Sequence, residues 1–188
     1  MSYFTEQDAR SIIRNAYREV QSDDTKVAAS IYGAEEIAGL PRSAATLSLG
    51  VGHPVRHAGL KPGEMVLDLG CGAGIDTLLA ARAVGPEGRA VGLDMTPEMV
   101  GRARENALLM GLENARIQEG LVEENPLPDG SVDVVISNGV LNLSTRQSRV
   151  LAEAFRVLRP GGRVSNTDLV LAEALPEAVL KSPAALAG

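Results

Sequence analysis

One short stretch of the sequence combines residue types that could hold a small ligand. Residues 65–76 read Met-Val-Leu-Asp-Leu-Gly-Cys-Gly-Ala-Gly-Ile-Asp, so Asp68 precedes three glycines at alternate positions. Glycine has no Cβ, so the backbone there can take positive φ and lie close to a ligand. The free N–H groups at the start of the helix expected from Ile75 favour an anionic or electron-rich ligand group. Glycine turns join many strands to helices, so this run alone is a weak signal for a nucleotide-like ligand.

A second acidic residue, Asp94, follows the next apolar run and strengthens that signal. An acid at this position can accept hydrogen bonds from a ribose diol. The alternative is that Asp94 caps the next helix, but Thr96, followed by Pro97, already supplies a start signal for that helix. We therefore favour the ribose role. Dinucleotide sites prefer G-x-G-x-x-G, and the spacing here makes a nicotinamide-dependent oxidoreductase the less favoured alternative.

Alternating strands and helices must position these residues. Apolar runs and helical spacing predict strands at 66–69, 90–93, 115–118, 132–137 and 163–171, and helices at 75–84, 97–111 and from Ser144 to about Leu158. Ser144 and Gln147 form an expected capping box, and Arg159-Pro160-Gly161-Gly162 is expected to stop that helix. This alternation is typical of a parallel sheet with helices on both faces. The ligand is then expected at the carboxyl ends of the first, second and fourth strands.

The first third of the chain has a different pattern. Residues 5–21 predict an amphipathic helix that Thr5 can cap, and a short helix is expected at 34–38. A loop over 47–54 then leads to the first strand. Two interpretations stay open for this region: a lid over the following domain, or a packing helix with a plain connector.

Composition excludes several classes of protein. The 188 residues fit one domain with a sizeable core, and the net charge of −6 comes without a basic stretch, which argues against nucleic-acid binding. The single cysteine, Cys71, excludes an intramolecular disulfide and a site of several thiolates. We expect no metal site, because His53 and His57 lack a third ligand nearby and are expected at the surface. No apolar run approaches the roughly 20 residues of a membrane span, and the start is unlike a signal peptide, so a cytoplasmic protein is expected.

Four motifs, taken together, resemble those of class I S-adenosylmethionine-dependent methyltransferases. They lie at 66–74, 92–94, 127–133 and 157–162. The resemblance covers about residues 64–171 and implies a Rossmann-like α/β sheet in strand order 3-2-1-4-5, with S-adenosyl-L-methionine as cofactor. It implies that the glycine loop holds the methionine part, that Asp94 binds ribose and that Met95 packs on adenine. The cofactor-binding residues expected by this resemblance are Asp68, Gly70, Cys71, Gly72, Gly74, Asp94, Met95, Val122, Ser137 and Asn138.

A narrower resemblance, to arsenite methyltransferases, extends over nearly the whole chain. It rests on residues 31–37, 49–54, 137–144 and 175–178. It implies an N-terminal helical cap and connector over 1–60 and a cofactor-binding core over 61–188. That subfamily binds trivalent arsenic with soft thiolates. Here Val51 and Gly139 stand at positions where its cysteines are expected, and Leu121 replaces a usual acid near the adenine, for which Glu123 is a candidate substitute.

The end of the sequence also differs from the class I pattern. Those enzymes usually carry two further strands after the fifth, and strands 6 and 7 have no counterpart in this sequence. The alternatives are a truncated chain or a site that a partner chain completes. Because the fifth expected strand is apolar for a sheet edge, we expect a homodimer through this strand or through the tail after Pro176.

The expected function is methylation of a small molecule, with an acceptor that the sequence does not identify. Methyl transfer from a sulfonium depends mostly on positioning. Only a hydroxyl acceptor needs a strong base, for which Asp168 is a candidate, and Asn142 is the other candidate near the reacting atoms. The alternative is a non-catalytic S-adenosylmethionine-binding relative that acts as a sensor or partner subunit.

Overall fold

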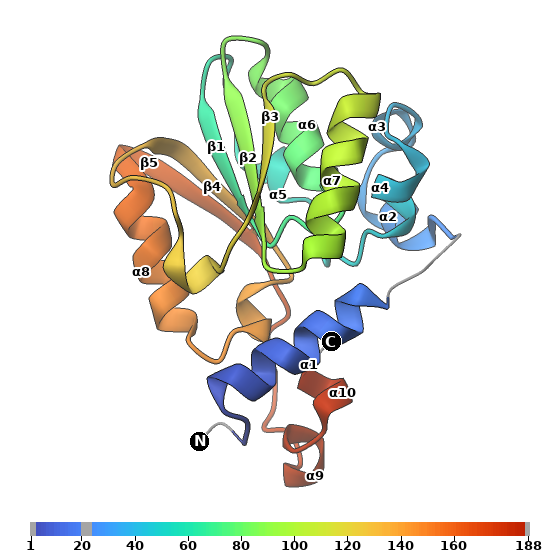
Figure 1. The fold of residues 1–188 in the computed structure, drawn as a ribbon, viewed down its shortest axis with the longest axis vertical. Helices are drawn as coiled ribbons and strands as arrows, with labels where there is room; N and C mark the ends of the chain where they lie inside the picture. The colour runs from blue at the N-terminus through green and yellow to red at the C-terminus, as the bar shows by residue number, and fades with distance from the viewer. Residues whose placement is uncertain (1–2, 20–23, 187–188) are drawn as a thin grey trace.

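A five-stranded parallel sheet forms the centre of the molecule (Figure 1). The computed structural model describes residues 3–19 and 24–186. In the order in which they lie across the sheet, the strands are β3 (Ala115–Glu119), β2 (Arg89–Asp94), β1 (Met65–Leu69), β4 (Val132–Asn138) and β5 (Leu158–Thr167). All four pairings are parallel. The predicted strand order is therefore confirmed.

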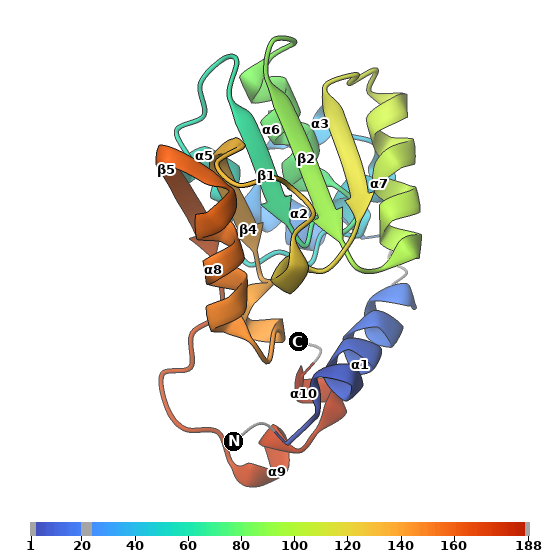
Figure 2. The same cartoon turned by 60° about the vertical axis from the view of Figure 1, so that its left-hand side comes forward.

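Helices cover both faces of this sheet, as Figures 1 and 2 show. Successive residues of a strand point to opposite faces, so Val66 packs toward one layer and Leu67 toward the other. The layer over Val66 contains α5 (Pro54–His57) and α6 (Ile75–Val84), with α7 (Pro97–Leu109) beside α6; the opposite layer contains α8 (Gln147–Val157). The central strands are apolar on both sides because helices bury both faces.

The N-terminal helix α1 (Glu6–Arg18) lies across the carboxyl ends of the strands (Figure 2). Thr5 caps it in a capping box with Asp8, as its sequence predicts. The expected continuation to residue 21 is not found, because the helix ends at Arg18; residues 20 and 21 lie outside the described part. The next helices, α2 (Lys26–Ile31), α3 (Ala34–Ala38) and α4 (Arg42–Thr46), pack beside α6 and α7. The division into 1–60 and 61–188 stays a prediction.

Two predicted boundaries near α8 are wrong. The helix begins at Gln147 with Arg146 at its N-cap, and no capping box forms, because the Ser144 hydroxyl donates to Glu123 and accepts the N–H of Arg146. The helix ends at Val157, just before the predicted stop at 159–162, so that stop is confirmed. The second wrong boundary is the start of the next strand, because β5 begins at Leu158 and not at residue 163.

A register shift in the pairing with β4 lets β5 include residues 159–162, although their sequence is typical of a turn. Leu158 pairs with Val132, the register then shifts, and pairing resumes between Arg163 and Val134. Gly161 takes φ of +83°, a conformation that favours glycine. The strand also ends at Thr167 and not at residue 171, so the apolar residues 169–171 lie outside the sheet.

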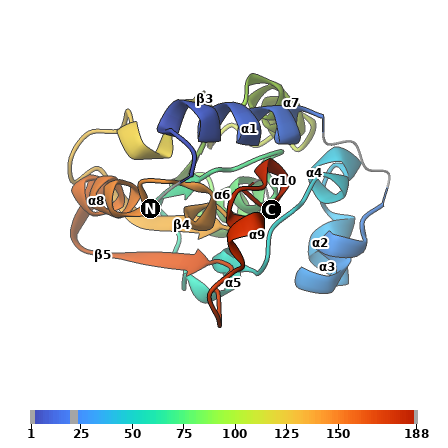
Figure 3. The same cartoon turned by 90° about the horizontal axis from the view of Figure 1, so that it is seen from below.

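The chain after β5 returns toward its beginning. It contains α9 (Glu177–Leu180) and α10 (Pro183–Leu186), and α10 lies against α1, as the view from below shows (Figure 3). Two short 3₁₀ helices, η1 (Val122–Glu124) and η2 (Leu141–Leu143), complete the elements of the described residues. Within that part of the chain, none of the helices has the length and apolar character that a membrane crossing requires.

A glycine on β2 sets how closely the glycine loop approaches the sheet, which gives a first prediction. A Cβ on Gly92 would lie 2.6 Å from Thr77 Oγ1 and 2.8 Å from Cys71 Sγ. We expect Gly92→Ala to lower the free energy of unfolding in urea by roughly 1–3 kcal/mol, because overpacking displaces these side chains. The control Gly101→Ala, on an open face of α7 with no atom within 4 Å of the new Cβ, is expected to raise stability by up to about 1 kcal/mol. Equal stability of Gly92→Ala and wild type would contradict this close packing.

Candidate functional site

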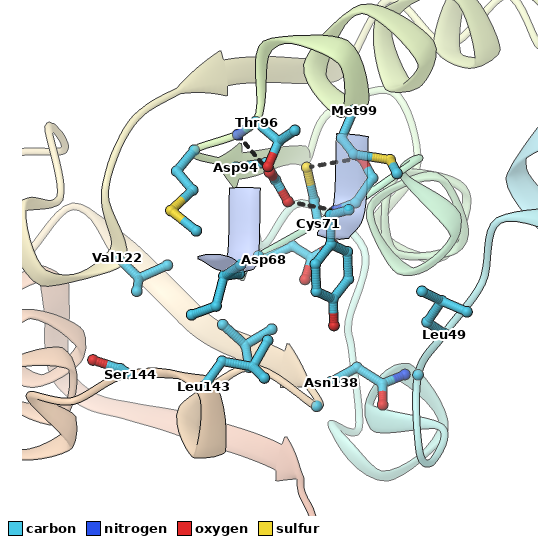
Figure 4. Close-up of a pocket in the computed structure, with 18 of the residues that line it drawn as sticks. Leu49, Asp68, Cys71, Asp94, Thr96, Met99, Val122, Asn138, Leu143 and Ser144 are labelled. Carbon is cyan, nitrogen blue, oxygen red and sulfur yellow. Dashed lines mark hydrogen bonds between the residues drawn. The ribbon is translucent and has the colours of Figure 1, made fainter. Parts of the chain in front are cut away.

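A cavity lies at the carboxyl ends of β1, β2 and β4, where the sequence predicts the ligand (Figure 4). Its walls come from the turn after β1, from residues 94–96 after β2 and from residues 138–140 after β4. The loop at 47–50 closes one side. The apolar face of α1 closes another with Ala9, Ile13 and Tyr17. The helix α1 therefore forms part of the cavity wall, and the interpretation of the N-terminal region as a lid stays a prediction.

The glycine turn is fixed to the end of β2 by main-chain hydrogen bonds. The N–H groups of Gly70 and Cys71 both donate to the carbonyl oxygen of Leu93, at 2.8 and 3.0 Å. The three glycines have φ of +68°, +53° and +94°. Gly74 adds a packing reason, since a Cβ there would lie 3.1 Å from Ala103 Cβ on α7. Main-chain hydrogen bonds and packing on α7 therefore hold the turn in place.

Asp94 joins this turn to the start of α7. Its Oδ2 accepts the N–H of Gly72 at 2.9 Å, and its Oδ1 accepts the N–H of Thr96 at 2.8 Å. Thr96 is the N-cap residue of α7, as the sequence predicts, but its side chain makes no capping hydrogen bond to the helix. Burial raises the pKa of Asp94. Each carboxylate oxygen has a second lone pair, so Asp94 keeps acceptor capacity toward the cavity.

Asp68 and Cys71 are buried beneath the turn. Asp68 Oδ2 accepts a 2.6 Å hydrogen bond from the Thr77 hydroxyl of α6, and burial raises the pKa of Asp68 well above its ordinary value. Cys71 packs against Val100 and Ala103. Burial also raises the pKa of the Cys71 thiol, so it stays protonated and is a poor nucleophile or metal ligand.

The Asn138 side chain connects four segments at the other end of the cavity. Its Oδ1 accepts the N–H groups of Val51 and Gly52 and the hydroxyl of Thr167. Its Nδ2 donates to the Gly52 carbonyl oxygen at 2.7 Å and to Asp76 Oδ2 at 2.9 Å. This amide therefore fixes the loop that carries Val51 against the ends of β4 and β5.

Val51 and Gly139 lie next to each other at that end. A Cβ built on Gly139 would be 3.7 Å from Val51 Cγ1. The two positions at which the sequence resemblance expects cysteines therefore converge in space. Their present side chains, an isopropyl group and a hydrogen atom, offer no donor atom to a metalloid.

Sequence reasoning missed Asp76 as a site residue. It lies in the first turn of α6, is only 4% exposed, and lines the cavity. Its Oδ2 accepts the Tyr32 hydroxyl and the Asn138 amide, both at 2.9 Å, whereas its buried Oδ1 has no hydrogen-bond partner. Burial raises its pKa to about 6. The one available signal was that residues 75–84 are apolar nearly all round, which implies that an acid among them is buried as well.

Most predicted cofactor-binding residues are brought together. Eight of them line the cavity: Asp68, Gly70, Cys71, Gly72, Asp94, Met95, Val122 and Asn138. Gly74 packs on α7 instead, and Ser137 is buried with its hydroxyl unpartnered. Their roles stay predictions.

The two catalytic candidates, Asn142 and Asp168, contact each other but do not line the cavity. The Asn142 N–H donates to Asp168 Oδ2 at 3.3 Å. With its amide oriented to satisfy both groups, Asn142 Nδ2 donates to Asp168 Oδ1 at 2.7 Å and to the Gly139 carbonyl oxygen at 3.2 Å. Neither side chain is among those that line the cavity. Their arrangement is that of a hydrogen-bonded support for the turn after β4.

The histidines differ in burial. His53 is buried against Tyr32 with ring centroids 4.6 Å apart, and its Nε2 lies 2.9 Å from Glu36 Oε1. The expectation of a surface position is wrong for His53 because its Nδ1 accepts the N–H of Arg56 and starts α5. His57 is exposed. Across residues 3–19 and 24–186, no three His, Cys, Asp or Glu side chains group to hold a metal ion.

Glu123 lies at the edge of the cavity nearest η1. It is buried, accepts the Ser144 hydroxyl at 2.6 Å, and lies 3.8 Å from Arg10 Nη2 of α1. It thus places a carboxylate close to the position where Leu121 replaces an acid, and it links that edge of the cavity to α1.

Comparison with known proteins identifies the family. The profile of the family described as methyltransferase domain matches residues 60–187, which is more than half of the chain. The chain belongs to this methyltransferase domain family. It is 45% identical over 170 residues to an arsenite methyltransferase of Halobacterium salinarum, an alignment that covers 89% of this chain and 43% of the relative. It is 37% identical to a demethylmenaquinone methyltransferase of Bacillus cytotoxicus, over 58% of this chain and 46% of that protein.

A solved structure supports the same assignment. The crystal structure of an arsenic(III) S-adenosylmethionine methyltransferase from Chlamydomonas reinhardtii matches this methyltransferase chain with a TM-score of 0.59 and 33% identity. The match covers 89% of this chain and 52% of the other. The chain thus spans about half the length of the relatives it matches.

Proposed function

We propose that this chain binds S-adenosyl-L-methionine and transfers its methyl group to a small-molecule acceptor. The observation that carries the proposal is the junction of Gly72 and Asp94, a carboxylate tied to a positive-φ glycine turn at the wall of a cavity. The family and the named activities of the relatives support it. Bound S-adenosylmethionine would supply an electrophilic methyl group on a sulfonium.

The charge of the cavity fits such a cationic ligand. Five acidic side chains and one basic one are among the described residues that line it: Glu6, Asp68, Asp76, Asp94, Glu123 and Arg10. The pKa values of its three aspartates are all raised, chiefly because burial disfavours their charged forms. A bound cation would stabilise these carboxylates.

Most of the predicted cofactor-binding residues have a place in this proposal. Asp94 would accept the ribose hydroxyls, Met95 and Val122 would pack on adenine, and the glycine turn would pass beneath the methionine part. Asp68 would hold the turn through Thr77 of α6. Asn138 would hold the loop that carries Val51 against the end of β4.

The alternative, a non-catalytic S-adenosylmethionine-binding protein, rests on Leu121 and the absent cysteines. The relatives carry the names of enzymes and give this alternative no support. We therefore keep a catalytic function, with a cytoplasmic location as a further proposal.

The first test concerns Asp94. We expect Asp94→Ala to bind S-adenosylhomocysteine at least about tenfold more weakly than wild type by titration calorimetry, because a hydrogen bond to a charged group is worth roughly 1.5–3 kcal/mol. Asp129→Ala, an exposed aspartate outside the cavity lining, is the control and should bind like wild type. Equal affinities for Asp94→Ala and wild type would sink the ribose assignment, and tighter binding of NAD would sink the whole proposal.

The second test concerns the acceptor. Purified wild type with S-adenosylmethionine, a thiol reductant and arsenite is expected to make no methylated arsenic above a no-enzyme control, because neither Val51 nor Gly139 supplies a thiolate. The double variant Val51→Cys/Gly139→Cys should bind arsenite at least about tenfold more tightly than Val51→Ser/Gly139→Ser, since soft ligands hold the metalloid. Gly139 has φ of +69°, so both variants carry the same strain. Wild-type turnover near one per second would overturn this interpretation.

We also propose a homodimer through the β5 edge. In the described residues β5 pairs with β4 alone, and Val164 on that strand is 48% exposed. A second β5 edge would satisfy its free main-chain groups. Light scattering at micromolar concentration should give the mass of two chains, and Val164→Lys should return it to one. A wild-type monomer would contradict the proposal.

A further inference from the structure

Asp76 is a buried carboxylate that the proposed cofactor contacts do not use. One of its oxygens is saturated by neutral donors, the Tyr32 hydroxyl and the Asn138 amide. The other, Oδ1, is buried without a partner on a side chain that lines the cavity. A buried carboxylate oxygen without a hydrogen-bond partner destabilises the folded protein. A ligand that donates a hydrogen bond to this oxygen removes most of that destabilisation.

The position of Asp76 selects the kind of donor. It lies in the first turn of α6, so its carboxylate already occupies the place where the helix N-terminus would attract an anion. A second anionic group there would be repelled by Asp76. A positively charged donor, in contrast, pairs with the carboxylate and hydrogen-bonds to Oδ1.

The same contacts place Asp76 at the acceptor end of the cavity. Asn138, which donates to Asp76, also holds the loop of Val51 (Figure 4 shows Asn138 and Leu49 together at this end). Tyr32 supports Asp76 from the N-terminal region and is itself buried against His53. The carboxylate is therefore fixed by two side chains through Oδ2, and the buried Oδ1 is the oxygen that keeps no partner.

We propose that Asp76 is the anionic contact for a protonated amine bound in this cavity. The proposal rests on the proposed function. It names one chemistry with two possible sources: the α-ammonium group of the cofactor, or an ammonium group on the methyl acceptor. Asp76 acts here in binding and positioning, and no proton or methyl transfer is assigned to it.

Calorimetry with two probes tests the first source. Wild type, Asp76→Asn and the isosteric control Asp129→Asn are titrated with S-adenosylhomocysteine and with its analogue in which hydrogen replaces the α-ammonium. If the cofactor is the source, wild type and control prefer S-adenosylhomocysteine at least tenfold, and Asp76→Asn loses that preference while keeping its affinity for the analogue. If Asp76 has only a structural role, Asp76→Asn should bind both probes more weakly by the same factor.

Short alkylamines test the second source. Butylammonium and the isosteric butanol are titrated into the same three proteins, with and without saturating S-adenosylhomocysteine. Binding of butylammonium but not butanol, lost in Asp76→Asn only, assigns the site to the acceptor. If no probe shows an ammonium preference that depends on Asp76, the inference is overturned.

Two further observations separate the possible failures. If wild type does not bind S-adenosylhomocysteine at all, the proposed function fails, and the amine titration without cofactor still decides the role of Asp76. If Asp76→Asn does not fold, a crystal structure of wild type with the probe that binds replaces it. A ligand nitrogen within hydrogen-bond distance of Asp76 Oδ1 supports the inference, and any other position of that nitrogen refutes it.

Discussion

The contact between the glycine turn and the end of β2 is the constraint on which the cavity depends. The Leu93 carbonyl oxygen accepts two N–H groups of the turn, and the Asp94 carboxylate accepts a third from Gly72. These bonds join two neighbouring strand ends, so the main chain of one and the acid of the other face the same space. Gly92 permits this approach because a side chain there would overlap Thr77 and Cys71. The parallel sheet supplies the common edge, and the absence of a Cβ at Gly92 supplies the close fit.

The same region concentrates buried negative charge, which opposes folding. Asp76 shows in which direction pH changes the stability. Its pKa in the folded chain is raised to about 6, whereas an unfolded aspartate ionises near pH 4. Its contribution to stability is therefore fully present below about pH 4 and is lost as the pH rises through about 6. At neutral pH the folded chain carries this cost, which the hydrogen bonds from Tyr32 and Asn138 offset in part. Unpaired buried charge at a cavity wall is a usual sign that the wall serves binding more than stability.

Sequence reasoning succeeded where a local pattern and the fold agree. The parallel sheet, the turn at Gly70 and the convergence of Asp68 with Asp94 follow from apolar strands that alternate with helices, and the strand order follows from the family resemblance. It failed where a distant partner decided the outcome. Ser144 has the sequence of a cap, but Glu123 engages its hydroxyl. Asp76 and His53 were missed or misplaced because their partners, Tyr32 and Glu36, lie far away in sequence or in another element.

The two ends of the cavity are built from different parts of the chain, and this explains how one can change without the other. Asp94 and Met95 lie at the end of β2 and Glu123 follows β3, whereas Asn138 and Gly139 lie at the end of β4. The loop that carries Val51 packs against this end of β4. Asn138 fixes the loop through main-chain N–H groups, and these bonds do not depend on which side chain residue 51 carries. A change of side chain at residue 51 therefore leaves these bonds in place and alters only the groups that the loop presents at its surface. The side chains at this end, and not the fold, set the acceptor chemistry that we propose.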